Sequence, residues 1–216
     1  MTPTARTDSF FPPVRPSADP AELDEPLPGP GWSGPPWHYR PGIAGFSQLI
    51  GFSESTAVLF EGARSYPGGA VLRLAVRVRE TAREARRQLF AQLEFVHGRG
   101  MLHMGLQPGG LRWGLAFADG SRVTSLDDSP WDEAPPGDSM SWLPDRPVLL
   151  GVGRPEQGFD TWSRDLWLCP LPPGGPIRAV CLWPDRGIEE TSSTFDAAVL
   201  LSAAELATPM WPAVNP

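Results

Sequence analysis

The strongest constraint on the fold is the stretch from Asp165 to Thr194, where two apolar, aromatic-rich runs flank a corner made of proline and glycine. The first run ends W-L-C-P, the second reads I-R-A-V-C-L-W-P, and the chain restarts after it as G-I-E-E-T. Runs of this length and composition, bounded by Pro and Gly, are typical of β-strands. The stretch therefore predicts consecutive antiparallel strands of an all-β core.

Alternation of apolar and polar residues predicts further strands. Ala70–Arg79 alternates most clearly, with Leu and Val on one face and arginines on most of the other. Leu111–Phe117 alternates in the same way, and the Asp119-Gly120 pair after it is a strong hairpin signal. Further strands are expected at 46–52, 56–66, 122–126 and 148–152. About eight or nine strands result, which favours a mainly β fold, an antiparallel β-sandwich or flattened barrel.

Two accessory helices are expected beside the strands. Thr81 and Glu84 form the Thr-x-x-Glu pattern of a capping box, and apolar residues follow at helical spacing, which predicts a helix over about 82–95. Asp196 is a suitable N-cap for a second helix over about 197–207, which ends before Pro209.

Residues 1–45 are predicted to be an extended or disordered tail, because the prolines within it prevent a regular helix or a central strand. Residues 46–216 are predicted to form a single β-sandwich domain. Trp32 and Trp37 lie near the end of the tail, and aromatic rings are costly to leave in water. Two alternatives follow: this part of the tail packs on the domain as a strap, or it is a docking motif for a partner.

Charge and composition exclude several classes of protein. The net charge of -7 repels phosphate backbones, so nucleic acid is not an expected partner. No apolar run suits a membrane helix, and the N-terminus lacks the apolar core of a secretory signal, so a cytoplasmic protein without membrane contact is expected. In that setting Cys169 and Cys181 are expected to be buried free thiols rather than a disulfide. If the two strands that carry them form a hairpin centred on Pro173-Gly174, Cys169 lies opposite about Arg178 and not opposite Cys181.

The strand motifs also carry a resemblance. The run W-L-C-P-L-P-P-G-G-P-I-R-A-V-C-L-W-P-D-R-G-I-E-E-T, with A-R-S-Y-P-G-G-A-V-L-R-L and L-R-W-G-L-A-F-A-D-G-S-R before it, resembles a family of uncharacterised proteins from high-GC actinobacteria. The resemblance covers roughly residues 46–212 and implies no activity. The chain departs from the family pattern in a longer helix over Thr81–Val96 and in a short glycine stretch at Gly151–Gly153.

Chemistry-bearing motifs are absent from the sequence, which has no nucleophile elbow, phosphate loop, metal cluster or nucleotide fingerprint. Neither a cofactor nor a metal is expected, because His97 and His103 stand without nearby further ligands. Nine tryptophans are the most informative feature left. The candidate contact surface consists of five that are assigned to loops or to the tail, Trp32, Trp37, Trp131, Trp142 and Trp162.

Three hypotheses follow for function. The first is a non-enzymatic cytoplasmic protein that acts by contact with an unidentified protein partner or by self-association, using these tryptophans. The alternative is a small-ligand or glycan-binding module that uses the same rings for stacking. The third is a hydrolase in which His97 or His103 acts as a base.

Overall fold

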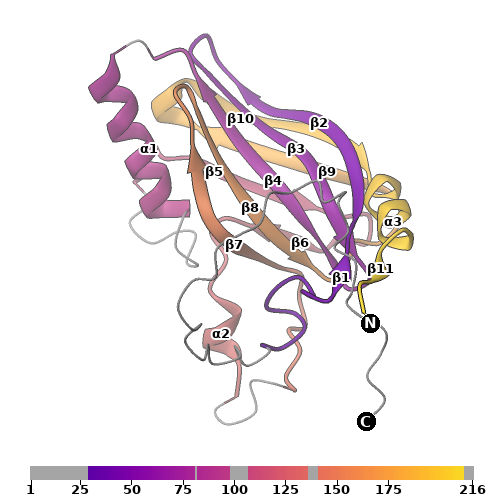
Figure 1. Cartoon of the computed structure of the whole chain (residues 1–216). Helices are drawn as coiled ribbons and strands as arrows, with labels where there is room; N and C mark the ends of the chain where they lie inside the picture. Colours follow the sequence, from indigo (N-terminus) through magenta and orange to yellow (C-terminus); the bar gives the residue numbers. More distant parts are fainter. Residues whose placement is uncertain (1–28, 81, 98–106, 136–140, 212–216) are drawn as a thin grey trace, which may run out of the picture.

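The structure is a computed structural model that describes residues 29–80, 82–97, 107–135 and 141–211. Within these ranges the chain forms strands in three antiparallel sheets with accessory helices, which confirms the predicted mainly β sandwich. Figure 1 shows α1 and α3 on opposite sides of the sheets and α2 below them. The helical elements are α1 (Arg83–His97), α2 (Pro130–Glu133), the 3-10 turn η1 (Pro184–Arg186) and α3 (Ala198–Glu205).

Two sheets make up the sandwich. The larger sheet is ordered β2 (Gly42–Phe52), β3 (Thr56–Tyr66), β4 (Gly69–Val78), β8 (Thr161–Cys169) and β7 (Val148–Gln157). The smaller sheet is ordered β10 (Ile188–Asp196), β9 (Pro176–Trp183), β5 (Arg112–Ala116) and β6 (Arg122–Thr124). A separate two-stranded ladder joins β1 (Tyr39–Arg40) to β11 (Thr208–Pro209).

The main core lies between the two sheets, and the alternating strands supply it as the sequence predicted. On β4 the side chains Leu72, Leu74 and Val76 are fully buried in this core. On and beside β5, Leu111, Trp113, Leu115 and Phe117 are buried in the same core. The predicted turn at Asp119-Gly120 is also confirmed, because β5 pairs with β6 across it and Gly120 has a φ of 86°.

The strands before and after the corner do not form the hairpin that their sequence allows. β8 pairs with β4 and β7 in the larger sheet, whereas β9 pairs with β5 and β10 in the smaller one. The corner therefore crosses from one sheet to the other, with Gly175 at a φ of 120°. A proline-glycine corner suits either a hairpin within one sheet or a crossing between the two sheets. Which of them forms depends on the strands that β8 and β9 pair with, among which β4 and β5 are distant in sequence. The pairing of β9 with β10 is antiparallel, as predicted.

The crossing also sets the surroundings of the two cysteines. Cys169 lies opposite Val148, not opposite Arg178, and Cys181 lies between Trp113 and Thr191 in the other sheet. Both are free thiols, as predicted, although Cys169 is only partly buried. Burial raises the pKa of both thiols, to about 12 for Cys181, so neither is poised as a thiolate.

Element boundaries differ modestly from the expected ones. The first strand of the larger sheet begins at Gly42 rather than at Phe46, and a Cβ on Gly42 would lie 1.7 Å from the carbonyl oxygen of Ala203 in α3. The absence of a side chain at Gly42 therefore lets the C-terminal helix close over the end of β2. Thr81, the expected first residue of the capping box, lies outside the described residues. In the described ranges, moreover, none of the helices combines the length and the apolar character that crossing a membrane requires.

Candidate binding surface

A second apolar cluster lies on the outer face of the larger sheet. Val71 and Trp167 alternate with core residues on adjacent strands and pair in register, so both project away from the main core. Leu150 of β7 lies opposite Trp167 and extends the cluster to the edge strand. An apolar patch on an outer sheet face needs a cover. Residues 29–38, which we term the strap, supply part of it.

Trp32 fixes the strap to the sheet. Its side chain is only 2% exposed, its Nε1 donates a hydrogen bond to the carbonyl oxygen of Trp142 at 2.9 Å, and its own carbonyl oxygen accepts one from Trp167 Nε1 at 2.9 Å. Buried indoles need such partners for their N–H groups. Of the two alternatives for the end of the tail, packing on the domain is therefore confirmed for Trp32.

Trp131 and Trp142 surround Trp32 from the long connection between β6 and β7. The ring of Trp131 in α2 lies 4.5 Å from that of Trp32, and the ring of Trp142 lies edge-on at 5.5 Å. Trp131 stays 46% exposed and Trp142 is half-buried. Three of the five predicted contact residues are thus brought together, but mainly to hold the strap.

Trp37 is different, because its side chain is 72% exposed. Its ring lies 5.5 Å from that of Trp211, which is 55% exposed, with the two planes inclined by 48°. The β1–β11 ladder creates this pair, and it is extended by a hydrogen bond from the Met210 N–H to the carbonyl oxygen of His38. We call the exposed apolar side chains that this ladder brings together the aromatic patch, which consists of Trp37, Met210 and Trp211.

A groove of about 400 Å3 opens beside Trp37. The strap forms most of its wall, including Gly29, Pro35 and Pro36, and Trp167 with Gly68 of the β3–β4 turn completes it. This lining is rich in proline and aromatic rings and poor in charge. Such a groove suits an apolar ligand or a peptide segment better than a polar metabolite.

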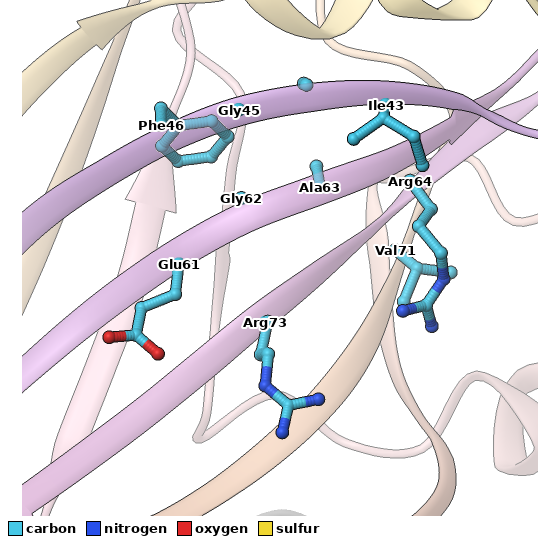
Figure 2. Close-up of a pocket in the computed structure, with 10 residues that line it drawn as sticks. Ile43, Gly45, Phe46, Glu61, Gly62, Ala63, Arg64, Val71 and Arg73 are labelled. Atoms are coloured by element: carbon cyan, nitrogen blue, oxygen red, sulfur yellow. The ribbon is translucent and has the colours of Figure 1, made fainter.

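The middle of the outer face carries charge instead. Figure 2 shows Arg64 and Arg73 projecting from β3 and β4 beside a second groove, of about 460 Å3, whose floor includes Gly45 and Gly62. Asp165 accepts from Arg64 Nη2 at 2.7 Å and lies 3.4 Å from Arg73 Nη1.

Further ion pairs neutralise this charged groove. Arg73 also pairs with Glu156, a hydrogen bond that, with the nearby charge of Asp165, raises the pKa of Arg73. Arg77 on the same strand pairs with Glu61. Because each of these arginines already has a carboxylate partner, the row is a neutralised sheet surface rather than an anion site.

Two of the five predicted contact residues do not belong to an accessible surface. Trp162 was expected in a loop, but it lies in β8 opposite Val76, is 0% exposed and belongs to the main core. The reason is that β7 continues past Gly153 and Pro155, so the β7–β8 hairpin brings Trp162 back into the sheet. Trp32 is buried by the strap contacts described above.

Trp211 and Met210 are surface residues that the sequence analysis missed. Both follow the C-terminal helix, and nothing in the local pattern marks them, because their exposure depends on the pairing of β11 with β1 at the other end of the described chain.

The residues of the enzymatic hypothesis gain no support. His103 lies outside the described residues, and for His97 the structure describes the backbone as the end of α1 but not the side chain. Among the residues that are described, no group of three or more His, Cys, Asp or Glu side chains could hold a metal ion.

Comparisons with known proteins leave the geometry as the basis for a functional conclusion: no family model, no curated protein and no solved structure matches this chain. The resemblance to the actinobacterial family stays a prediction.

Proposed function

We propose that this chain is a non-enzymatic, cytoplasmic binding protein that contacts a protein partner through the aromatic patch. The observation that supports this most is the Trp37–Trp211 pair, in which two large apolar rings stay more than half exposed although they contact each other. Tryptophan is the residue most enriched at the energetic centres of protein interfaces. Exposed apolar side chains that gather in one place mark interaction sites more often than scattered ones do.

Charge also favours a protein partner over a nucleic acid. The chain carries a net charge of -7, and the arginines on the outer face of the larger sheet are paired with carboxylates. The aromatic patch itself consists of uncharged side chains. A depletion of charge at the centre with polar groups around it is the usual composition of an interface core.

Site-specific crosslinking in host cells tests this proposal. A photoreactive phenylalanine at position 211 should form a defined crosslinked species, and the Trp37→Ala change in the same chain should reduce its yield at least about tenfold, as expected for a hot-spot residue. The matched control places the probe at Leu143, an exposed apolar residue outside the patch. Equal crosslinking from both positions, or a yield that Trp37→Ala leaves unchanged, would refute the proposal.

The small-ligand or glycan alternative is favoured by the groove beside Trp37. Its volume of about 400 Å3 lies in the range of ligand pockets, and Trp37 supplies a ring for stacking. Titrating oligosaccharides and apolar ligands while recording tryptophan fluorescence separates the two functions. A response that disappears in Trp37→Ala supports ligand binding, and a flat response across the panel removes this alternative.

A further inference from the structure

The aromatic patch and the groove beside it have the chemistry of a site for proline-rich peptide. A polyproline II segment lacks internal hydrogen bonds and presents pyrrolidine rings, which pack well against aromatic side chains, and aromatic-lined grooves are the common way in which proteins bind it. Here Trp37 belongs to both the patch and the groove, and the groove wall carries few charges. A segment that combines prolines with large apolar side chains would fit both parts.

The chain itself contains such a segment. Residues 10–16 read F-F-P-P-V-R-P, two aromatic rings followed by three prolines, one valine and one arginine. The described chain begins at Gly29, which itself lines the groove, so the preceding residues start at the site. Residues 17–28 connect the two and can span at most about 40 Å when fully extended. The segment is therefore within reach of the groove on its own chain.

We propose that residues 10–16 bind in cis to the groove and the aromatic patch, where they compete with the partner. This competition rests on the proposed function, whereas the docking does not. A segment tethered by a short connection has an effective concentration on the order of 1 mM. If the free peptide binds with a Kd of about 0.1 mM, the tethered one occupies the site about 90% of the time, and the apparent affinity for the partner falls about tenfold.

Fluorine NMR of the full-length protein labelled with 5-fluorotryptophan tests the docking. The changes Trp37→Phe and Trp211→Phe assign the two resonances. Replacing both Phe10 and Phe11 by Ser should shift these two resonances and leave that of buried Trp162 in place. The matched control Leu23→Ser alters the same part of the chain outside the segment and should shift neither.

A second measurement uses a synthetic peptide of residues 8–18. Added to the F10S/F11S protein, it should return the Trp37 and Trp211 resonances toward their original positions with a Kd near 0.1 mM, and a peptide carrying both serines should not. The proposal would be overturned if the Trp37 and Trp211 resonances shift neither on the F10S/F11S change nor on addition of several millimolar peptide. A wild-type dimer that F10S/F11S dissociates would place the segment on a second copy and would overturn docking in cis.

The crosslinking yield from position 211 separates this proposal from the proposed function. If both hold, F10S/F11S should raise the partner's apparent affinity about tenfold. If the resonances do not respond but Trp37→Ala still removes the crosslink, the docking fails and the proposed function stands. If the resonances respond and no patch-dependent crosslink forms, the docking stands and the proposed function fails.

Discussion

Replacement of Trp32 by alanine tests whether the strap is an integral part of the folded domain. The side chain is 2% exposed and contacts the rings of Trp131 and Trp142, so its removal leaves a large cavity on the outer face of the sheet. Changes of Phe or Trp to Ala at such sites cost about 3–5 kcal/mol. The lost hydrogen bond to the Trp142 carbonyl adds to this, because a net bond contributes about 1 kcal/mol. We therefore expect the upper half of that range.

Urea titration followed by circular dichroism measures the free energy of unfolding. In a domain of this size 1 kcal/mol corresponds to about 2–4 °C in Tm, so in thermal unfolding Trp32→Ala should lower the Tm by roughly 10–15 °C. Trp32→Phe retains most of the apolar volume and should cost only about 1–2 kcal/mol. The control is Trp37→Ala, five positions along the same strap, which should change stability by less than about 0.5 kcal/mol because that ring is exposed.

A loss below about 1 kcal/mol for Trp32→Ala would refute the reasoning, because it would mean that the strap leaves the sheet at little cost in solution. The comparison also has a functional use. If Trp37→Ala folds as stably as the wild type, any loss of binding in that variant reports on the surface rather than on the fold.

Three further predictions concern the interior. Gly42→Ala places a Cβ 1.7 Å from the carbonyl oxygen of Ala203 and should lower the free energy of unfolding, measured by urea titration, by about 1–3 kcal/mol or more. In the control Gly45→Ala the new Cβ meets nothing within 4 Å, so stability should not change. Equal effects of the two changes would contradict this. Burial raises the pKa of the Cys181 thiol to about 12, so the folded state keeps a proton that the unfolded state loses near pH 8.5. The free energy of unfolding should therefore fall by up to about 1.4 kcal/mol per pH unit between pH 9 and 12. Cys181→Ala should reduce this slope. Burial lowers the pKa of the Arg164 guanidinium, whose Nη1 donates a hydrogen bond to the carbonyl oxygen of Gly153 while its Nε has no partner among the described residues. The hydrogen bond lost in Arg164→Met is offset by relief of the buried charge, so this change should alter the free energy of unfolding by less than about 2 kcal/mol, and a larger loss would contradict this.

Strand identity could be predicted from the sequence wherever the local pattern alone decided it. The alternation of Leu72, Leu74 and Val76 with arginines needs only the period of a β-strand, and the Asp119-Gly120 turn needs only a glycine that tolerates positive φ. These features were correct because neither depends on residues far away in the sequence.

Sheet membership could not be predicted in the same way. The corner between β8 and β9 carries the same Pro and Gly residues whether it closes a hairpin or crosses the sandwich, and the choice depends on which strands supply the missing hydrogen bonds. Trp162 shows a related limit. Gly153 and Pro155 read as loop residues, yet an edge strand tolerates both, because its outer N–H groups have no strand partner.

The tryptophans show why the candidate surface was only half predictable. A proline-rich surrounding marks both Trp32 and Trp37 as lying outside the strands of the sandwich, but it does not say which of them meets the sheet. That depends on Trp167, whose N–H holds the Trp32 carbonyl, and on the short β1–β11 ladder, which leaves Trp37 beside Trp211 rather than under it. The strap thus buries one ring to anchor itself and presents the other, so the residues that stabilise this part of the fold also fix the position of its most exposed aromatic pair.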